Sequence, residues 1–135
     1  MSAPTTRAIL IERLGPPEVL VEREVPLEEL GPECLQLEVH AAGVNFADLL
    51  QRAGLYGTVP PRPYSPGFEV AGEVVRVGSA VKDWNVGDRA IALLRHGGYA
   101  RVGRPAEKSE RSHHQNGAGT RRQADLHQRQ PLLQP

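Results

Sequence analysis

The sequence holds a single cysteine, Cys34, among its 135 residues. One cysteine excludes an internal disulfide and any zinc site built from several cysteines. No apolar run approaches the ~20 residues that a membrane-spanning helix needs, and the N-terminus lacks the apolar core of a signal peptide. We therefore expect a reducing, cytoplasmic location and no contact with a membrane.

The sequence also carries no net charge, with 16 basic and 16 acidic residues. This balance argues against nucleic acid as the main partner. It hides a split, because residues 1–103 have a net charge of −3 and residues 104–135 a net charge of +3. Hydrophobic residues make up 39% of the chain, below the roughly 45–50% of ordinary globular proteins. The shortfall falls after residue 103, so one domain and a polar tail are expected.

The segment from Ser109 to Pro135 is rich in Gln, Arg and His, and its few apolar residues follow no period. Such a segment cannot bury enough apolar surface to offset its ordering entropy. We therefore predict a disordered tail over residues 109–135. Its Gly-rich run, residues 116–120, has no strand before it and no apolar helix after it, so it fails the test for a pyrophosphate-binding loop.

Before this tail, short apolar segments alternate with glycine and proline turns. Residues 35–40 are typical of a half-buried strand, because apolar and polar side chains alternate there. Further strands are predicted at residues 7–12, 20–25, 67–78, 90–94 and 99–102, with a bend at Gly72. Six short strands and one short helix predict a mostly β domain, a small antiparallel barrel.

The one helix is predicted over residues 46–53. Asn45 is a good N-cap, Asp48 lies in the first turn, and Gly54 suits the position after the last turn. One apolar face results from the spacing i, i+3, i+4, i+7 of four residues: Phe46, Leu49, Leu50 and Ala53. A loop with four prolines, residues 55–66, follows and is expected to be stiff.

Five motifs occur in a fixed order. They are Ala41-Ala42-Gly43-Val44-Asn45-Phe46-Ala47-Asp48, Gln51-Arg52-Ala53-Gly54-Leu55-Tyr56, Pro66-Gly67-Phe68-Glu69-Val70-Ala71-Gly72 with Val77-Gly78, Val86-Gly87-Asp88-Arg89, and Gly97-Gly98-Tyr99-Ala100. Each is weak alone, but the series resembles the zinc-independent quinone oxidoreductase branch of the medium-chain dehydrogenase/reductase superfamily, the zeta-crystallin-like enzymes. The resemblance covers roughly residues 6–108.

This resemblance implies that residues 1–108 form a GroES-like β barrel, the N-terminal catalytic domain. It further implies a Rossmann domain that binds NADPH, and reduction of quinones or conjugated carbonyls by hydride transfer. After Lys108 the sequence departs from the family, and we expect the Rossmann domain to be absent. A truncation or a shifted reading frame is our hypothesis, and the isolated chain is expected to be inactive. Family members dimerise, but the sequence does not indicate whether this chain does.

The resemblance also indicates that no metal is bound. Zinc-dependent relatives place a cysteine where Asn45 stands and a histidine where Phe68 stands. Thiolate and imidazole are ligands that zinc requires, and an amide and a phenyl ring do not replace them.

Four residues are candidates for the site. In the family, the residue matching Asn45 contacts the nicotinamide or the substrate, and the tyrosine matching Tyr56 faces the active-site cleft, where a phenol stabilises charge on a quinone oxygen. Asn45 as a helix cap and Tyr56 as a loop aromatic are the structural alternatives. Asp48 orients a cleft water or Tyr56, or only supports the helix start. Arg52 serves phosphate or quinone, or lies on a solvated face. Glu69 is expected to be structural, paired with an arginine.

Two other kinds of function remain open. The chain could be a non-enzymatic β-barrel module that binds a partner through the helix and the loop after it. It could also be a fragment without function.

Overall fold

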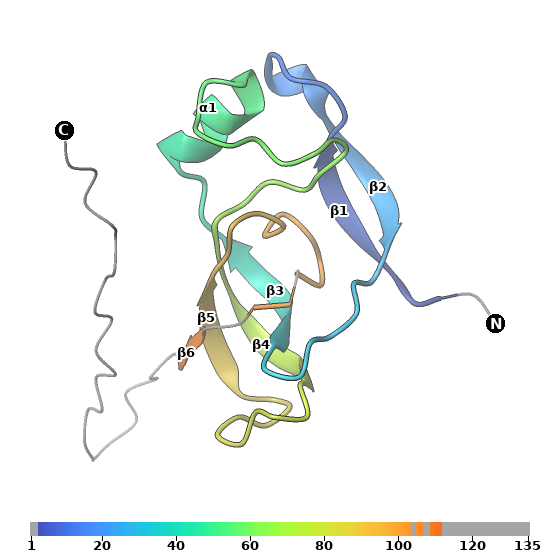
Figure 1. Cartoon of the computed structure of the whole chain (residues 1–135), viewed down its shortest axis with the longest axis vertical. Coiled ribbons are helices and arrows are strands. Elements are labelled where there is room, and N and C mark those ends of the chain that lie inside the picture. The colour runs from blue at the N-terminus through green and yellow to red at the C-terminus, as the bar shows by residue number, and fades with distance from the viewer. Residues whose placement is uncertain (1–2, 104, 107–108, 112–135) are drawn as a thin grey trace.

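The computed structural model describes residues 3–103, 105–106 and 109–111, and in that part of the chain the strands form two antiparallel sheets. A two-stranded sheet pairs β1 with β2, and a four-stranded sheet has the order β3-β4-β5-β6 (Figure 1). The elements are β1 (Thr5–Ile11), the 3₁₀ helix η1 (Pro17–Val19), β2 (Leu20–Pro26), β3 (Leu35–Ala42), α1 (Phe46–Ala53), β4 (Glu69–Val77), β5 (Arg89–Leu93) and β6 (Ser109–Arg111).

The prediction of a mostly β domain with one short α-helix is therefore confirmed. The two sheets are not closed into one continuous ladder. They are joined by isolated bridges, such as Ala8 with Ala100 and Glu38 with Val102. No helix among the described residues has the length and apolar character needed to cross a membrane.

The main core lies against the four-stranded sheet. Most of it is made of alternate residues of β3, β4 and β5, as the period of two predicts, and Ala106 adds to it from outside the strands. Gln36 departs from the predicted alternation, because it is only 1% exposed although it is polar. The buried members are Leu35, Leu37, Val70, Val74, Ala90, Ala92 and Ala106. Gly72 allows β3 and β4 to approach closely, because a Cβ there would lie 1.9 Å from the carbonyl oxygen of Glu38. Opposite Gly72, β3 has a register shift between Val39 and Ala41; β4 itself runs unbroken from Glu69 to Val77, and the bend at Gly72 stays a prediction.

The two-stranded sheet has a smaller core of its own, made of Ile11, Val19 and Tyr64. It is tied to the rest of the molecule by residues 99–103, which were expected to form a strand at 99–102. That prediction is wrong, because the segment divides its hydrogen bonds between two sheets. The N–H of Ile9 in β1 donates to the carbonyl of Tyr99 (2.8 Å), whereas the N–H of Val39 in β3 donates to the carbonyl of Arg101 (2.8 Å). No regular ladder forms with either sheet, and only bridges at Ala100 and Val102 remain.

The start of the expected tail also differs from the prediction. Residues 109–111 form β6 and pair with β5 from Ala90 to Ala92. Backbone ladder bonds do not require apolar side chains, so the polar composition of this segment did not prevent the pairing. The predicted boundary at residue 109 thus falls inside the β structure, and the rest of the predicted tail, residues 112–135, lies outside the described residues.

Candidate functional site

The start of α1 is fixed by hydrogen bonds of a buried carboxylate. Asn45 is the N-cap residue, with extended backbone (φ −101°, ψ 157°), and it forms a capping box with Asp48. Asp48 is only 5% exposed. Its Oδ2 accepts the N–H of Asn45 at 2.8 Å, and its Oδ1 accepts the N–H of Gly67 at 3.1 Å. Asp48 therefore ties the first turn of α1 to the turn that precedes β4.

The side chain of Asn45 is held by Glu69, the first residue of β4. The amide Nδ2 donates to Glu69 Oε1 at 3.2 Å. Gly43 makes room for this carboxylate, because a Cβ there would lie 2.0 Å from the same oxygen. The predicted structural role of Glu69 thus has the amide of Asn45 as a partner, where we had expected an arginine. The cap fixes the backbone of Asn45, and the contact with Glu69 orients its amide.

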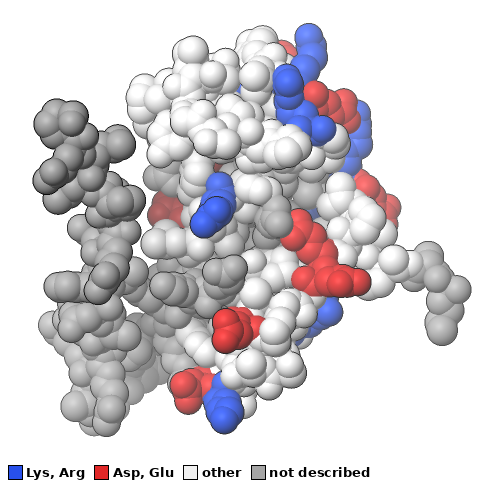
Figure 2. All heavy atoms as spheres, viewed as in Figure 1, with Lys and Arg blue, Asp and Glu red and all other residues white. Residues whose placement is uncertain are grey.

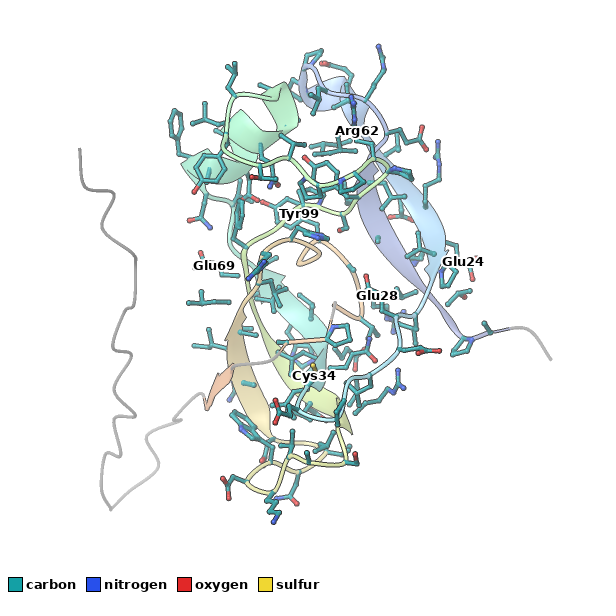
Figure 3. All side chains as sticks on the ribbon, in the orientation of Figure 1. Glu24, Glu28, Cys34, Arg62, Glu69 and Tyr99 are labelled. Carbon is teal, nitrogen blue, oxygen red and sulfur yellow. The ribbon has the colours of Figure 1, made fainter. Side chains whose placement is uncertain are left out.

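Tyr99 completes this polar cluster, which consists of Asn45, Asp48, Glu69 and Tyr99. Its hydroxyl donates to the carbonyl of Gly43 at 3.3 Å. Burial raises the pKa of Tyr99 above the usual 10.0, and the negative charges of Asp48 and Glu69 raise it further. The phenol is therefore neutral at physiological pH and acts as a donor. Figure 3 shows Glu69 below α1 and Tyr99 nearer the centre of the view, between α1 and the β1–β2 hairpin.

The sequence did not identify Tyr99 as a site residue. The available signal was the glycine pair before it, because small residues mark places where backbones approach closely. A Cβ on Gly67, which has φ +104°, would lie 2.7 Å from Tyr99 Cδ1. A Cβ on Gly98 would lie 3.0 Å from the carbonyl oxygen of Gly67. The glycines thus bring the Tyr99 ring against the turn that Asp48 holds.

The apolar face of α1 points away from the protein. Phe46 is 72% exposed and Leu49 is 45% exposed, whereas the polar residues Asp48 and Gln51 are buried. The apolar face predicted from the spacing is present, but it does not pack on the core. We define the outer apolar face by its exposed members, which are Val44, Phe46, Leu49, Leu55 and Tyr56. Figure 2 shows mostly uncharged surface over α1 in this view, and charged side chains gather on the β1–β2 side.

Tyr56 lies at the edge of the outer apolar face. Its ring contacts that of Phe68 edge-on, with centroids 5.9 Å apart and planes at 67°. Phe68 directly precedes Glu69, so Tyr56 packs beside the segment that holds Asn45. Tyr56 as a whole is 43% exposed, so it is accessible to a ligand that lies on the outer apolar face.

Arg52 lies at the other end of α1. Its guanidinium donates to the carbonyl of Gly15, and the N–H of Gly15 donates back to the carbonyl of Arg52 at 3.1 Å. These contacts attach the end of the helix to the loop after β1. Of the four candidates, the structure thus brings Asn45 and Asp48 together, places Tyr56 nearby and separates Arg52 from them.

The described residues include no group of three His, Cys, Asp or Glu side chains placed to hold a metal ion. What the cluster offers is an oriented amide, two carboxylates and a neutral phenol beside an exposed apolar surface. An amide both donates and accepts hydrogen bonds, so Asn45 suits a carboxamide or a carbonyl group. The apolar surface suits a flat, uncharged ring.

The turn from Asn85 to Asp88 has the same two hydrogen bonds as the start of α1, but it lies outside the polar cluster. The N–H of Asn85 donates to Asp88 Oδ2 at 3.0 Å, and the N–H of Asp88 donates to the carbonyl of Asn85 at 3.1 Å. The corresponding bonds at Asn45 and Asp48 are 2.8 and 3.0 Å. Asn85 is exposed, on the loop before β5, so this turn is a matched control for substitutions at α1.

The model of the alcohol dehydrogenase GroES-like domain matches residues 31–125. The chain belongs to this family. It is 41% identical over 92 residues to a quinone oxidoreductase-like protein 2 homolog of Nematostella vectensis, covering 68% of this chain and 25% of that protein. These similarities place it in the quinone oxidoreductase branch of the medium-chain dehydrogenase/reductase superfamily.

Solved structures of relatives share the fold. The human synaptic vesicle membrane protein VAT-1 homolog-like protein superposes with a TM-score of 0.79 at 28% identity, over 84% of this chain and 37% of that chain. A mycobacterial protein solved in complex with NADPH superposes with a TM-score of 0.73 at 30% identity, over 82% of this chain and 35% of that chain. The GroES-like chain thus spans between about a quarter and two-fifths of the length of these relatives.

Proposed function

We propose that the chain supplies the substrate-facing part of an NADPH-dependent oxidoreductase that reduces quinones or conjugated carbonyls without zinc. The observation that carries this proposal is the Asn45 amide, which Glu69 and the helix cap hold beside the outer apolar face. The quinone oxidoreductase-like relatives and the relative complexed with NADPH support the reaction class and the cofactor.

The residues around Asn45 fit a nicotinamide ring. The amide of Asn45 can hydrogen-bond the carboxamide of the ring, and the outer apolar face can lie against its plane. NADPH supplies a hydride when bound. The protein's own part is to orient the ring and the acceptor and to exclude water from the apolar surface between them.

Tyr56 has the chemistry to assist the acceptor. A phenol that donates a hydrogen bond to a carbonyl oxygen stabilises the negative charge that develops there. Asp48 and Tyr99 act on the site through Asn45 and Gly43, because their hydrogen bonds fix the backbone that carries the amide. They are positioning residues, and Arg52 has no part in the proposed chemistry.

The proposal is tested with duroquinone, whose ring carbons are all substituted, so that it cannot add to Cys34. We expect amide NMR signals of Asn45 and Tyr56 to shift saturably as duroquinone is added. Without cofactor the Asn45 amide can donate to a quinone carbonyl instead, so Asn45→Ala should weaken this binding at least tenfold, about 1.4 kcal/mol, and the matched variant Asn85→Ala should leave it unchanged. Equal loss in both variants, or no saturable shift, would contradict the proposal.

Turnover is a separate test. With NADPH and duroquinone, we expect the 135-residue chain to show no oxidation of NADPH. The reason is that the described residues form a GroES-like domain and include no dinucleotide-binding domain. Measured turnover by the purified chain would refute this part while leaving the binding result intact. A cytoplasmic location also stays a prediction, which fractionation of cells expressing the chain would test.

The outer apolar face also favours a second candidate function. Five exposed apolar side chains on α1 and its flanks could bind a protein partner without any cofactor. A stable partner captured by the chain, together with absence of duroquinone binding, would favour this alternative. Loss of the captured partner in Leu49→Gln would place the contact on α1.

A further inference from the structure

A cavity of about 340 Å³ lies between the two sheets, and it opens to solvent. Its walls come from β1, the end of β2 and the segment after it, Gln36 of β3, the proline-rich loop and residues 96–103. Asn45, Asp48, Tyr56 and Glu69 do not line it. In Figure 3, Glu28, which lines the cavity, lies on the β2 side of the molecule, whereas Glu69 lies on the β5 side. The cavity is therefore separate from the polar cluster at α1.

Small residues leave this space unfilled. Ala8, Ala100, Gly97 and Gly103 line it, and the chain offers no large side chain at these positions. Packed interiors usually leave few voids larger than a water molecule, so an open space of this size between two sheets requires walls that resist collapse.

Backbone hydrogen bonds supply that resistance. Ala8 and Ala100 face each other in a bridge, and the N–H of Arg101 donates to the carbonyl of Arg7 at 2.8 Å. The N–H of Val102 donates to Thr6 Oγ1 at 3.0 Å. These bonds hold residues 99–103 in place against β1, so this part of the wall is preformed.

The polar groups of the wall are already engaged within the chain. Gln36, which is 1% exposed, donates from Nε2 to the carbonyl of Gly103 at 3.2 Å and accepts from Arg76 at 2.9 Å. Ser65 Oγ donates to the carbonyl of Tyr99 at 3.3 Å. Glu28 also interacts within the chain. A charged ligand would have to compete for these groups, so the cavity favours an uncharged one.

The remaining wall suits a flat ring. Tyr64 and His96 meet edge-on with centroids 6.1 Å apart and planes at 80°, and both line the cavity. Three prolines of the loop, Pro60, Pro61 and Pro63, add rigid apolar surface. The volume lies at the lower end of the roughly 300–1,000 Å³ that small-molecule sites occupy, which fits one or two rings.

We propose that this cavity binds a flat, uncharged aromatic molecule of one or two rings, at a site distinct from the Asn45 cluster. The probe is indole, added to the full chain labelled with ¹⁵N. We expect saturable shifts at the amides of Ala8, Ser65, Ala100 and Gly103. Indole-3-carboxylate, which has the same rings and a negative charge, should bind at least tenfold more weakly.

A pair of variants locates the binding. Ala100→Leu fills the cavity and should weaken indole binding at least tenfold, whereas Ala80→Leu, at an exposed position outside the cavity, should not change it. Shifts confined to the outer apolar face, or equal affinity in both variants, would overturn the proposal. If Ala100→Leu fails to fold, nuclear Overhauser effects between indole and the methyls of Ala8 and Ala100 in the unchanged chain decide it, and their absence at saturation overturns it.

Discussion

Replacing Asp48 by alanine should destabilise the chain strongly, although the residue is a short polar one on a two-turn helix. The carboxylate accepts the N–H groups of Asn45 and Gly67 and is almost fully buried. Loss of the contact at the helix start costs about 1 kcal/mol. The N–H of Gly67, left buried without an acceptor, costs about 1–3 kcal/mol more. The expected loss is therefore about 2–4 kcal/mol.

Urea unfolding, followed by the fluorescence of the single tryptophan, Trp84, measures this loss. Asp88→Ala is the control, because it removes a bond of the same local geometry at the turn before β5. Asp88 is half-buried and has a further interaction within the chain, so we expect this control to lose about 1 kcal/mol, which is less than the loss in Asp48→Ala. Asp48→Asn keeps one acceptor oxygen, so its loss in the free energy of unfolding should lie between those of Asp88→Ala and Asp48→Ala. If Asp48→Ala lost no more than Asp88→Ala, the inference that Asp48 fixes α1 would be wrong.

Three further predictions concern Tyr99, α1 and β4. The raised pKa of Tyr99 means that its contribution to the free energy of unfolding is complete below pH ~10 and is lost as pH rises through the folded pKa. Tyr99→Phe should therefore flatten the alkaline fall in stability, and unfolding curves of equal slope with pH would refute this. Phe46→Ser should lower the free energy of unfolding by less than about 0.5 kcal/mol, whereas Val74→Ala, at a fully buried site, should lower it by about 2 kcal/mol or more. Similar losses in the two variants, measured by urea unfolding, would contradict the exposed position of the apolar face of α1. Gly72→Ala should lower the free energy of unfolding by about 3 kcal/mol, because its Cβ would overlap the β3 backbone. Gly87→Ala should lower it by about 1 kcal/mol, because its Cβ would meet nothing within 4 Å and only the left-handed backbone is strained. The reverse order in thermal unfolding would be inconsistent with the close approach at Gly72.

Features that depend on neighbouring residues could be predicted from the sequence. The helix was placed at residues 46–53, and α1 has these bounds. Its caps, Asn45 and Gly54, act within one turn of the helix, so the residues themselves carry the signal. The strand at residues 35–40 was predicted for the same reason, because its period of two is a local pattern, and the structure extends it to Ala42.

Features that depend on distant contacts could not be predicted. The spacing of Phe46 and Leu49 gives an apolar face but does not say whether it meets the core or the surface. The orientation is decided by Asp48, whose carboxylate accepts a hydrogen bond from the N–H of Gly67, nineteen residues away. The hydroxyl of Tyr99 reaches the carbonyl of Gly43, fifty-six residues away, so no local pattern could reveal that it joins the site.

Residues 99–103 also set an order on folding. The β1–β2 hairpin precedes residues 99–103 in the chain, but outside its own ladder its bonds run to Arg52, to Tyr64 and to residues 99–103. An isolated hairpin is marginal in water, and contacts between residues far apart in sequence form slowly because the loop between them must close. On a ribosome, we therefore expect the β1–β2 hairpin to remain unprotected until residue 103 has left the exit tunnel. These two strands, which emerge before β3, β4 and β5, should be among the last to become resistant to proteolysis.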